Sequence, residues 1–178
     1  MRIRFLAFGA LLIAAVFVFL QTRSSSYRVE RSLSIAAAPR EVYRHIDDLH
    51  EWQRWSPWDE LDPKLKRTFS GPERGKGASY AWEGNAQVGK GRIAITAAKP
   101  PESVRYSVLF EQPLQTEMTY DFALAADGAV TKVTWVFQGE HPFWAKAFAL
   151  FLDLDKQLGA DMDKGLAALK VLLEAEQG

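Results

Sequence analysis

The stretch "SVRYSVLFEQPLQTEMTYDFALAADGAVTKVTWVFQGE", residues 103–140, decides the fold, because its apolar side chains alternate with polar ones. The alternating apolar positions are Val104, Tyr106, Val108 and Phe110, then Met118, Tyr120, Phe122 and Leu124, and finally Val133, Trp135 and Phe137. A period of two is typical of strands that bury one face. The turns "EQP" and "ADG" separate the three runs, so we expect antiparallel hairpins with one apolar face and one solvated face.

The sequence before residue 103 continues this pattern. Strand-like runs at 64–71, 78–84 and 92–98 are separated by turns rich in glycine, and an earlier strand is expected over 27–37. One of these turns, "GNAQVGKG" at 84–91, has the glycine and lysine spacing of a phosphate-binding loop. Gly91, however, stands where that loop needs Ser or Thr, and a strand follows instead of a helix. We interpret the segment as a hairpin turn.

Two helices are expected. In "APREVYRHIDDLHEW", residues 38–52, Pro39 suits a first helical turn and an apolar stripe follows it, which predicts an amphipathic helix of about three turns. From Pro142 the apolar period becomes helical again, and the stripe consists of Phe151, Leu154, Leu158, Met162, Leu166, Leu169 and Leu173. Gly159 and Gly165 weaken this long helix and mark a bend or a close approach to the sheet. The stripe and the apolar sheet face are expected to bury each other.

The N-terminus carries a separate segment. Phe5–Leu20 is an apolar run of 16 residues with arginines on both sides, close to the length that crosses a bilayer about 30 Å thick. We therefore predict a transmembrane anchor over residues 1–22, a linker over 23–26 and a globular domain over 27–175. A cleaved signal peptide is the alternative, although "QTRSSS" offers no small-residue cleavage site. The signal-like start favours a single-pass membrane protein with its domain on the exported, periplasmic side.

The composition excludes several classes of function. Lys and Arg together number 22, as do Asp and Glu, so no net charge attracts nucleic acid. The chain has no cysteine, which removes disulfides, thiolate catalysis and thiolate metal sites. His45, His50 and His141 lack the spacing of metal ligands and are expected at the surface, as are the neighbouring carboxylates Asp47 and Asp48. We therefore expect no metal and no cofactor.

The order of strand, helix, antiparallel strands and long C-terminal helix resembles the helix-grip fold of the START and birch-pollen-allergen superfamily, often called SRPBCC, in its polyketide cyclase-like branch. The segments that carry the resemblance are "IAAAPREVYRHIDD" (35–48), "WQRWSPW" (52–58), "ASYAWEGN" (78–85), "GKGRIAIT" (89–96), "TKVTWVFQG" (131–139) and "GADMDKGLAALK" (159–170). The fold class expected is α+β, with a curved antiparallel sheet of about six or seven strands wrapped on the C-terminal helix, plus the N-terminal transmembrane helix.

The resemblance implies an apolar cavity between the sheet and the C-terminal helix, which holds lipids, sterols, polyketides or similar molecules. It does not imply one activity, because the superfamily mixes carriers, sensors and enzymes. Tyr hydroxyls and Trp indoles inside such a cavity supply the few polar groups that orient an apolar ligand. The candidate ligand-binding residues are Trp55, Trp58, Tyr80, Trp82, Tyr106, Phe110, Tyr120, Trp135, Leu158 and Met162. For each of these residues, a structural role in the hydrophobic core is the alternative to ligand binding.

The stretch "HEWQRWSPWDELDP", residues 50–63, concentrates three of the tryptophans. Pro57 disfavours helix at Ser56, so Trp58 is expected to point away from the direction of Trp52. The cluster is either an apolar plug that joins the first helix to the sheet edge, or a wall of the cavity mouth formed by Trp55 or Trp58. The sequence leaves both interpretations open.

Catalytic residues are not apparent. A buried carboxylate with a raised pKa would serve acid–base chemistry, and Asp155, at the margin of the C-terminal stripe, is the best position for one. The sequence favours a membrane-anchored domain that binds a small hydrophobic molecule such as a lipid, polyketide or isoprenoid, without catalysis. The alternatives are a cyclase, aromatase or dehydratase, and an envelope protein-interaction module with a closed core. A protein partner is not assigned.

Overall fold

The computed structural model describes residues 18–19, 21–22, 24–113, 115–140 and 154–177. The chain divides into one unit of Met1–Tyr27 and Glu140–Asp153, and a larger unit of Arg28–Gly139 and Leu154–Gly178. The start of the predicted C-terminal helix, residues 142–153, and nearly all of the Phe5–Leu20 run lie outside the described residues. Within the described ranges, no helix combines the length and the apolar character that crossing a bilayer requires.

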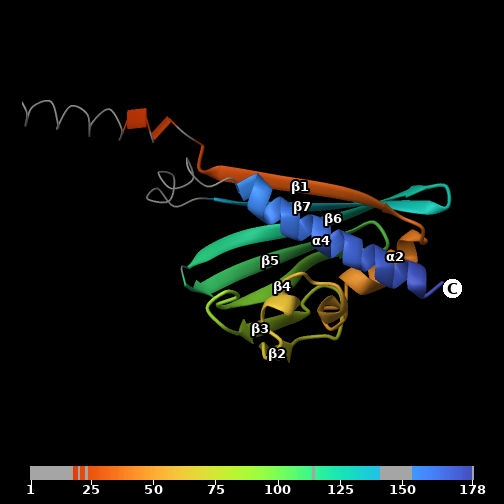
Figure 1. The fold of residues 1–178 in the computed structure, drawn as a ribbon, viewed down its shortest axis with the longest axis horizontal. Coiled ribbons are helices and arrows are strands. Elements are labelled where there is room, and N and C mark those ends of the chain that lie inside the picture. Colours follow the sequence, from red (N-terminus) through yellow and green to blue (C-terminus); the bar gives the residue numbers. More distant parts are fainter. Residues whose placement is uncertain (1–17, 20, 23, 114, 141–153, 178) are drawn as a thin grey trace, which may run out of the picture. The chain divides into compact units, whose positions relative to one another are not determined.

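Seven strands form a single curved sheet in the larger part of the chain, in the order β1-β7-β6-β5-β4-β3-β2 (Figure 1). Their bounds are β1 (Ser26–Ile35), β2 (Lys66–Ser70), β3 (Ser79–Glu83), β4 (Lys90–Lys99), β5 (Ser103–Gln112), β6 (Thr116–Asp127) and β7 (Val130–Glu140). Consecutive strands from β2 to β7 pair antiparallel. The predicted antiparallel sheet is confirmed, and residues 84–89 of the segment 84–91 form the β3–β4 connection, as expected for a hairpin turn.

Helix α4 (Leu154–Ala175) lies across one face of this sheet, as the blue ribbon in Figure 1 shows. The stripe predicted from the sequence faces inward, with Met162, Leu166, Leu169 and Leu173 at most 2% exposed. These side chains belong to the same core cluster as Phe122 and Trp135 of the sheet. The α+β arrangement of a curved sheet gripping a C-terminal helix therefore agrees with the expected fold.

Glycine at position 165 permits the close contact between α4 and the sheet. A Cβ atom placed on Gly165 would lie 3.0 Å from Trp135 Cζ3 and 3.0 Å from Pro57 Cδ. This is tighter than ordinary van der Waals contact, so a side chain here would require Trp135 or Pro57 to shift by a few tenths of an ångström. The close approach predicted for this glycine is confirmed.

The first helix is shorter than predicted. Helix α2 (Pro39–Ile46) has 8 residues, about two turns instead of the expected three, and two short 3₁₀ segments follow, η1 (Glu51–Arg54) and η2 (Asp59–Leu61). Leu49, which continues the apolar spacing of Val42 and Ile46 in the predicted helix, is nevertheless buried, at 1% exposure. A turn after Ile46 buries Leu49 as well as a further helical turn would. The apolar spacing therefore predicted a helix that was too long.

Aromatic side chains donate hydrogen bonds to the carbonyl groups at the end of α2. The last carbonyls of a helix have no partner within it and need other donors. Trp52 Nε1 donates to the Ile46 carbonyl at 3.4 Å, and the Tyr106 hydroxyl of β5 donates to the same oxygen. Trp55 Nε1 donates to the His45 carbonyl at 3.2 Å. These bonds replace the contacts that a further helical turn would have made.

We expect Tyr106→Phe to destabilise the fold by about 0.5–1.5 kcal/mol, because it removes one of the two hydrogen bonds to the buried Ile46 carbonyl while Trp52 keeps the other. Tyr43→Phe is the matched control, since the Tyr43 hydroxyl is buried with no hydrogen-bond partner in the described part of the chain. Losing that hydroxyl is expected to be neutral or stabilising. Urea denaturation of both variants checks the prediction, and equal losses of stability would contradict it.

Candidate functional site

A cavity of about 180 Å³ lies between strands β2–β6, the segment of η1 and η2, and the start of α4. Its apolar wall consists of Trp52, Trp58, Leu65, Trp82, Val88, Ile93, Val108, Phe110, Met118 and Leu158. Its polar or amphipathic wall consists of Ser56, Asp59, Arg67, Tyr80, Gln87 and Tyr120. A cavity of about 150 Å³ is enough to bind benzene. This volume therefore fits a ring or a short chain, but not a whole sterol.

The floor of the cavity depends on Gly91 in β4. A Cβ atom there would lie 2.6 Å from the Trp82 ring, so only glycine allows Trp82 to lie across the neighbouring strand. Trp82 Nε1 donates to the Val88 carbonyl at 3.1 Å, and its ring meets Phe110 edge-on at 5.2 Å. The indole N–H is thereby satisfied within the protein, and Trp82 offers the cavity mainly apolar surface.

The two interpretations of the tryptophan cluster apply to different residues. Trp52 and Trp55 are each 2% exposed and form the plug between α2 and the sheet. Trp58 is half-buried, lines the cavity, and stacks near Tyr120 and Phe137 at centroid distances of 6.2 and 5.8 Å. Trp55 does not line this cavity, because its ring is turned into the core and its N–H is bound to the His45 carbonyl.

The structure brings some of the other predicted residues together and separates the rest. The candidates that share the cavity wall are Trp58, Tyr80, Trp82, Phe110, Tyr120 and Leu158. Tyr106, Trp135 and Met162 are 0% exposed and lie in the packed core outside that wall. Tyr106 is held there by its bond to the Ile46 carbonyl, and Trp135 by ring contacts with Trp55 and Phe122. Ligand binding by the wall residues stays a prediction.

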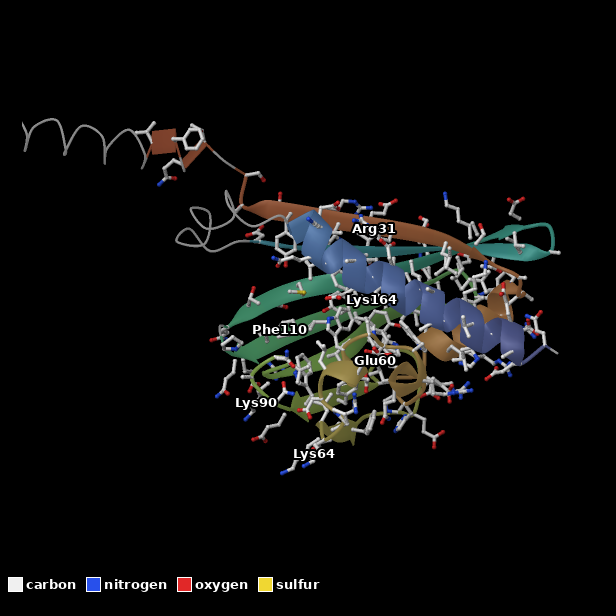
Figure 2. All side chains as sticks on the ribbon, viewed as in Figure 1. Arg31, Glu60, Lys64, Lys90, Phe110 and Lys164 are labelled. Atoms are coloured by element: carbon white, nitrogen blue, oxygen red, sulfur yellow. The ribbon has the colours of Figure 1, made fainter. Side chains whose placement is uncertain are left out.

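An ion pair in the cavity wall was missed by the sequence reasoning. Arg67 of β2 donates to the Asp59 carboxylate of η2, and the two side chains are only 10% and 19% exposed. Arg67 lies between Leu65 and Phe69, and residues two apart in a strand share a face. That alternation already indicated an arginine on the apolar face. Nothing in the sequence indicated Asp59 as its partner. Figure 2 labels Phe110 of the cavity wall and Glu60, the neighbour of Asp59.

Tyr80 lies beside this ion pair. The Arg67 guanidinium is 5.7 Å from the centroid of the Tyr80 ring. Burial raises the pKa of the Tyr80 phenol to about 12, although the guanidinium pulls the pKa in the opposite direction. The phenol is therefore protonated at neutral pH, and it can both donate and accept a hydrogen bond.

The expected acid–base candidate is not buried. Asp155 is exposed, and its hydrogen bond with Arg31 holds the pKa of its carboxyl below the usual value. The prediction of a buried acid at this position is therefore wrong. An ionised carboxylate bound to arginine is the opposite of a proton donor with a raised pKa.

The histidines and the adjacent carboxylates also differ from expectation. His45 is 5% exposed, with Nδ1 3.0 Å from Glu51 Oε2 and Nε2 3.1 Å from Glu176 Oε2. His50 is exposed as predicted, whereas His141 lies outside the described residues. Asp47, expected in solvent, is 8% exposed. Across the described ranges, no group of histidines and carboxylates is arranged to hold a metal ion.

Asp47 makes the stability of the fold depend on pH. Burial raises the pKa of its carboxyl above the ordinary 3.8, against the pull of Arg74, and its Oδ1 atom is buried without a partner in the described residues. Between pH 3.8 and the raised folded-state pKa, the native chain keeps a proton that the unfolded chain has released. Stability therefore falls as the pH rises through this interval.

We expect Asp47→Asn to stabilise the protein at neutral pH, because it removes a buried charge. The gain over the wild type should shrink as the pH falls toward 3.8, the ordinary value for an aspartate. Thermal melts of both proteins from pH 3.5 to 7.5 measure it. Asp127→Asn, at the exposed β6–β7 turn, is the control. A gain that is independent of pH would contradict this account of Asp47.

Comparisons with known proteins agree with the expected fold. Residues 26–174 match the profile of the family described as polyketide cyclase / dehydrase and lipid transport. The chain is similar to protein CV1439 from Chromobacterium violaceum, with 19% identity and a TM-score of 0.57, over 84% of this chain and 97% of that one. The Aha1 dimer from Colwellia psychrerythraea is similar with 19% identity and a TM-score of 0.59, over 85% and 99%.

A third solved structure shares the same fold. Ara h 8.0201 is 13% identical to this chain, with a TM-score of 0.54 over 84% of this chain and 99% of that one. The helix-grip resemblance is thereby confirmed at the level of the fold. Comparison with curated protein sequences finds no match for the chain.

Proposed function

The chain belongs to the polyketide cyclase/dehydrase and lipid transport family, and from that premise we propose that it binds a small apolar ligand without catalysis. The observation that carries the proposal is the cavity of about 180 Å³ that the protein's own side chains leave unfilled. Protein interiors are close-packed, and voids larger than a water molecule are few. A cavity walled mostly by aromatic and aliphatic side chains suits an apolar occupant better than water.

The ionisable groups of the wall support binding over catalysis. General acid–base catalysis works best with a group whose pKa lies near the operating pH. The pKa of Tyr80, about 12, is far above the operating pH, and the Asp59 carboxylate is paired with Arg67. Among the described residues, no histidine lines this cavity. The wall thus offers shape and a few hydrogen-bonding groups. A cyclase or dehydratase would need a titrating group there.

Binding is tested by titrating the full chain in lipid nanodiscs with 1-octanol and following tryptophan fluorescence. Trp52, Trp58 and Trp82 line the cavity and report on its occupation. Val108→Phe enlarges a buried wall residue and fills the space, so we expect the saturable fluorescence change to disappear while the melting temperature is kept. Octanol also dissolves in lipid, and the variant in identical nanodiscs shows how much of the signal comes from that.

Met162→Leu is the matched control for this experiment. Met162 is buried outside the cavity, and a volume-conserving exchange there costs less than about 1.5 kcal/mol. Its titration should match that of the wild type. If the wild type responds no differently from Val108→Phe, the cavity takes no apolar ligand and the proposal fails. Chemical conversion of an added polyketide would favour the enzyme instead.

We also propose that Phe5–Leu20 anchors the chain in a membrane, with the domain on the exported side. Apolar ligands partition into bilayers, so an anchor keeps the cavity close to their source. A C-terminal alkaline phosphatase fusion is expected to be active, and the intact mass of the membrane-bound chain is expected to include residues 1–22. An inactive phosphatase fusion, together with a fluorescent fusion to green fluorescent protein, would place the domain in the cytoplasm. An intact mass that lacks the first residues would show that the segment is cleaved.

A further inference from the structure

The two charged groups of the cavity and the Tyr80 phenol lie together at one end. Asp59 comes from η2, Arg67 from β2 and Tyr80 from β3, all within a short span of the sequence. The part of the wall that comes from β4, β5, β6 and α4 is apolar apart from Tyr120: Ile93, Val108, Phe110, Met118 and Leu158. Ser56 and Gln87 are the other polar residues of the wall. Such a cavity is complementary to an amphipathic molecule with one polar head and an apolar body.

The charges at this polar end cancel. Arg67 by itself would attract a carboxylate or a phosphate, because a guanidinium matches their geometry. Here the Asp59 carboxylate already binds the guanidinium, and both side chains are largely shielded from solvent. An anionic head group beside Arg67 would therefore also meet the negative charge of Asp59. It would lose its own hydration as well, without a net attraction to replace it.

An uncharged head group fits both partners at once. A hydroxyl donates its hydrogen to a carboxylate and accepts one from a guanidinium, and a carbonyl oxygen accepts from the guanidinium alone. Arg67 has several N–H groups, and one of them is bound to Asp59, so donors remain for a ligand. The phenol of Tyr80 beside the pair adds one group that donates or accepts.

We propose that the Asp59–Arg67 pair makes the cavity selective for amphipathic ligands with an uncharged oxygen-containing head, an alcohol or a carbonyl compound, and excludes carboxylates of the same chain length. The inference rests on the proposed function, because it describes the ligand of the same cavity. It also gives the ion pair a role that packing alone does not require. A pair that only stabilises the fold would affect ligands of every charge equally.

The test compares 1-octanol, methyl octanoate and octanoate at pH 7.5, by tryptophan fluorescence of the full chain in nanodiscs. Val108→Phe is the reference for lipid partitioning. Wild-type protein should bind the alcohol and the ester at least about tenfold more tightly than the carboxylate, because a like charge in contact is strongly unfavourable. Octanoate that binds as tightly as octanol would overturn the inference and leave the proposed function intact. If no ligand differs from the Val108→Phe reference, the proposed function itself fails.

Substitution of either partner should change the preference in a defined direction. Asp59→Asn keeps the shape and leaves the cation unpaired, so the preference for octanol over octanoate should fall about tenfold or more. Arg67→Gln leaves the anion unpaired, so octylammonium should gain affinity in the same way. Circular dichroism and melting curves identify a variant that does not fold, and the other variant then decides. Equal losses for all ligands in a folded variant would show that the pair is only structural.

Discussion

The carbonyl groups at the end of α2 are the constraint on which the rest of the structure depends. Trp52 and Trp55 reach back to them from the following segment, and Tyr106 reaches them from the middle of the sheet. One set of hydrogen bonds therefore ends the helix, fixes the chain after it and joins both to β5. Since the donors are aromatic, the same side chains also fill the interior with large apolar surface.

This capped plug determines where the interior is packed and where it is open. The Trp135 ring lies 6.4, 5.8 and 5.8 Å from the rings of Trp52, Trp55 and Trp58. Between α2 and the middle of the sheet the space under α4 is therefore filled. Trp58 is the last of the three, and it stands at the boundary, with Trp135 on one side and the cavity on the other. Asp59 follows Trp58 directly in the chain, so the plug also positions the carboxylate that pairs with Arg67 at the polar end of the cavity.

The sequence predicted the elements whose apolar pattern repeats over many residues. The alternation over 103–140 and the stripe from Leu158 to Leu173 both have the faces expected of them. Shorter patterns were ambiguous, since Leu49 is buried by a turn as well as it would have been by a helix. Asp47 and His45 were expected at the surface, which failed because their burial depends on neighbours from other segments of the chain, and the alternation around Arg67 indicated its face but not its partner Asp59. No pattern within one segment contains that information.

The division between a packed part and an open part separates the residues that stabilise the fold from those that line the cavity. The packed part rests on β5, β6 and β7, strands of 10, 12 and 11 residues that carry Tyr106, Phe122 and Trp135. The polar end of the cavity is carried by β2 and β3, strands of only 5 residues each at one edge of the sheet. Short edge strands have fewer hydrogen bonds and less buried surface, and such regions open at a lower free energy than the core. Local opening on the side of β2 and β3 would therefore leave intact the aromatic plug that holds α2, the sheet and α4 together.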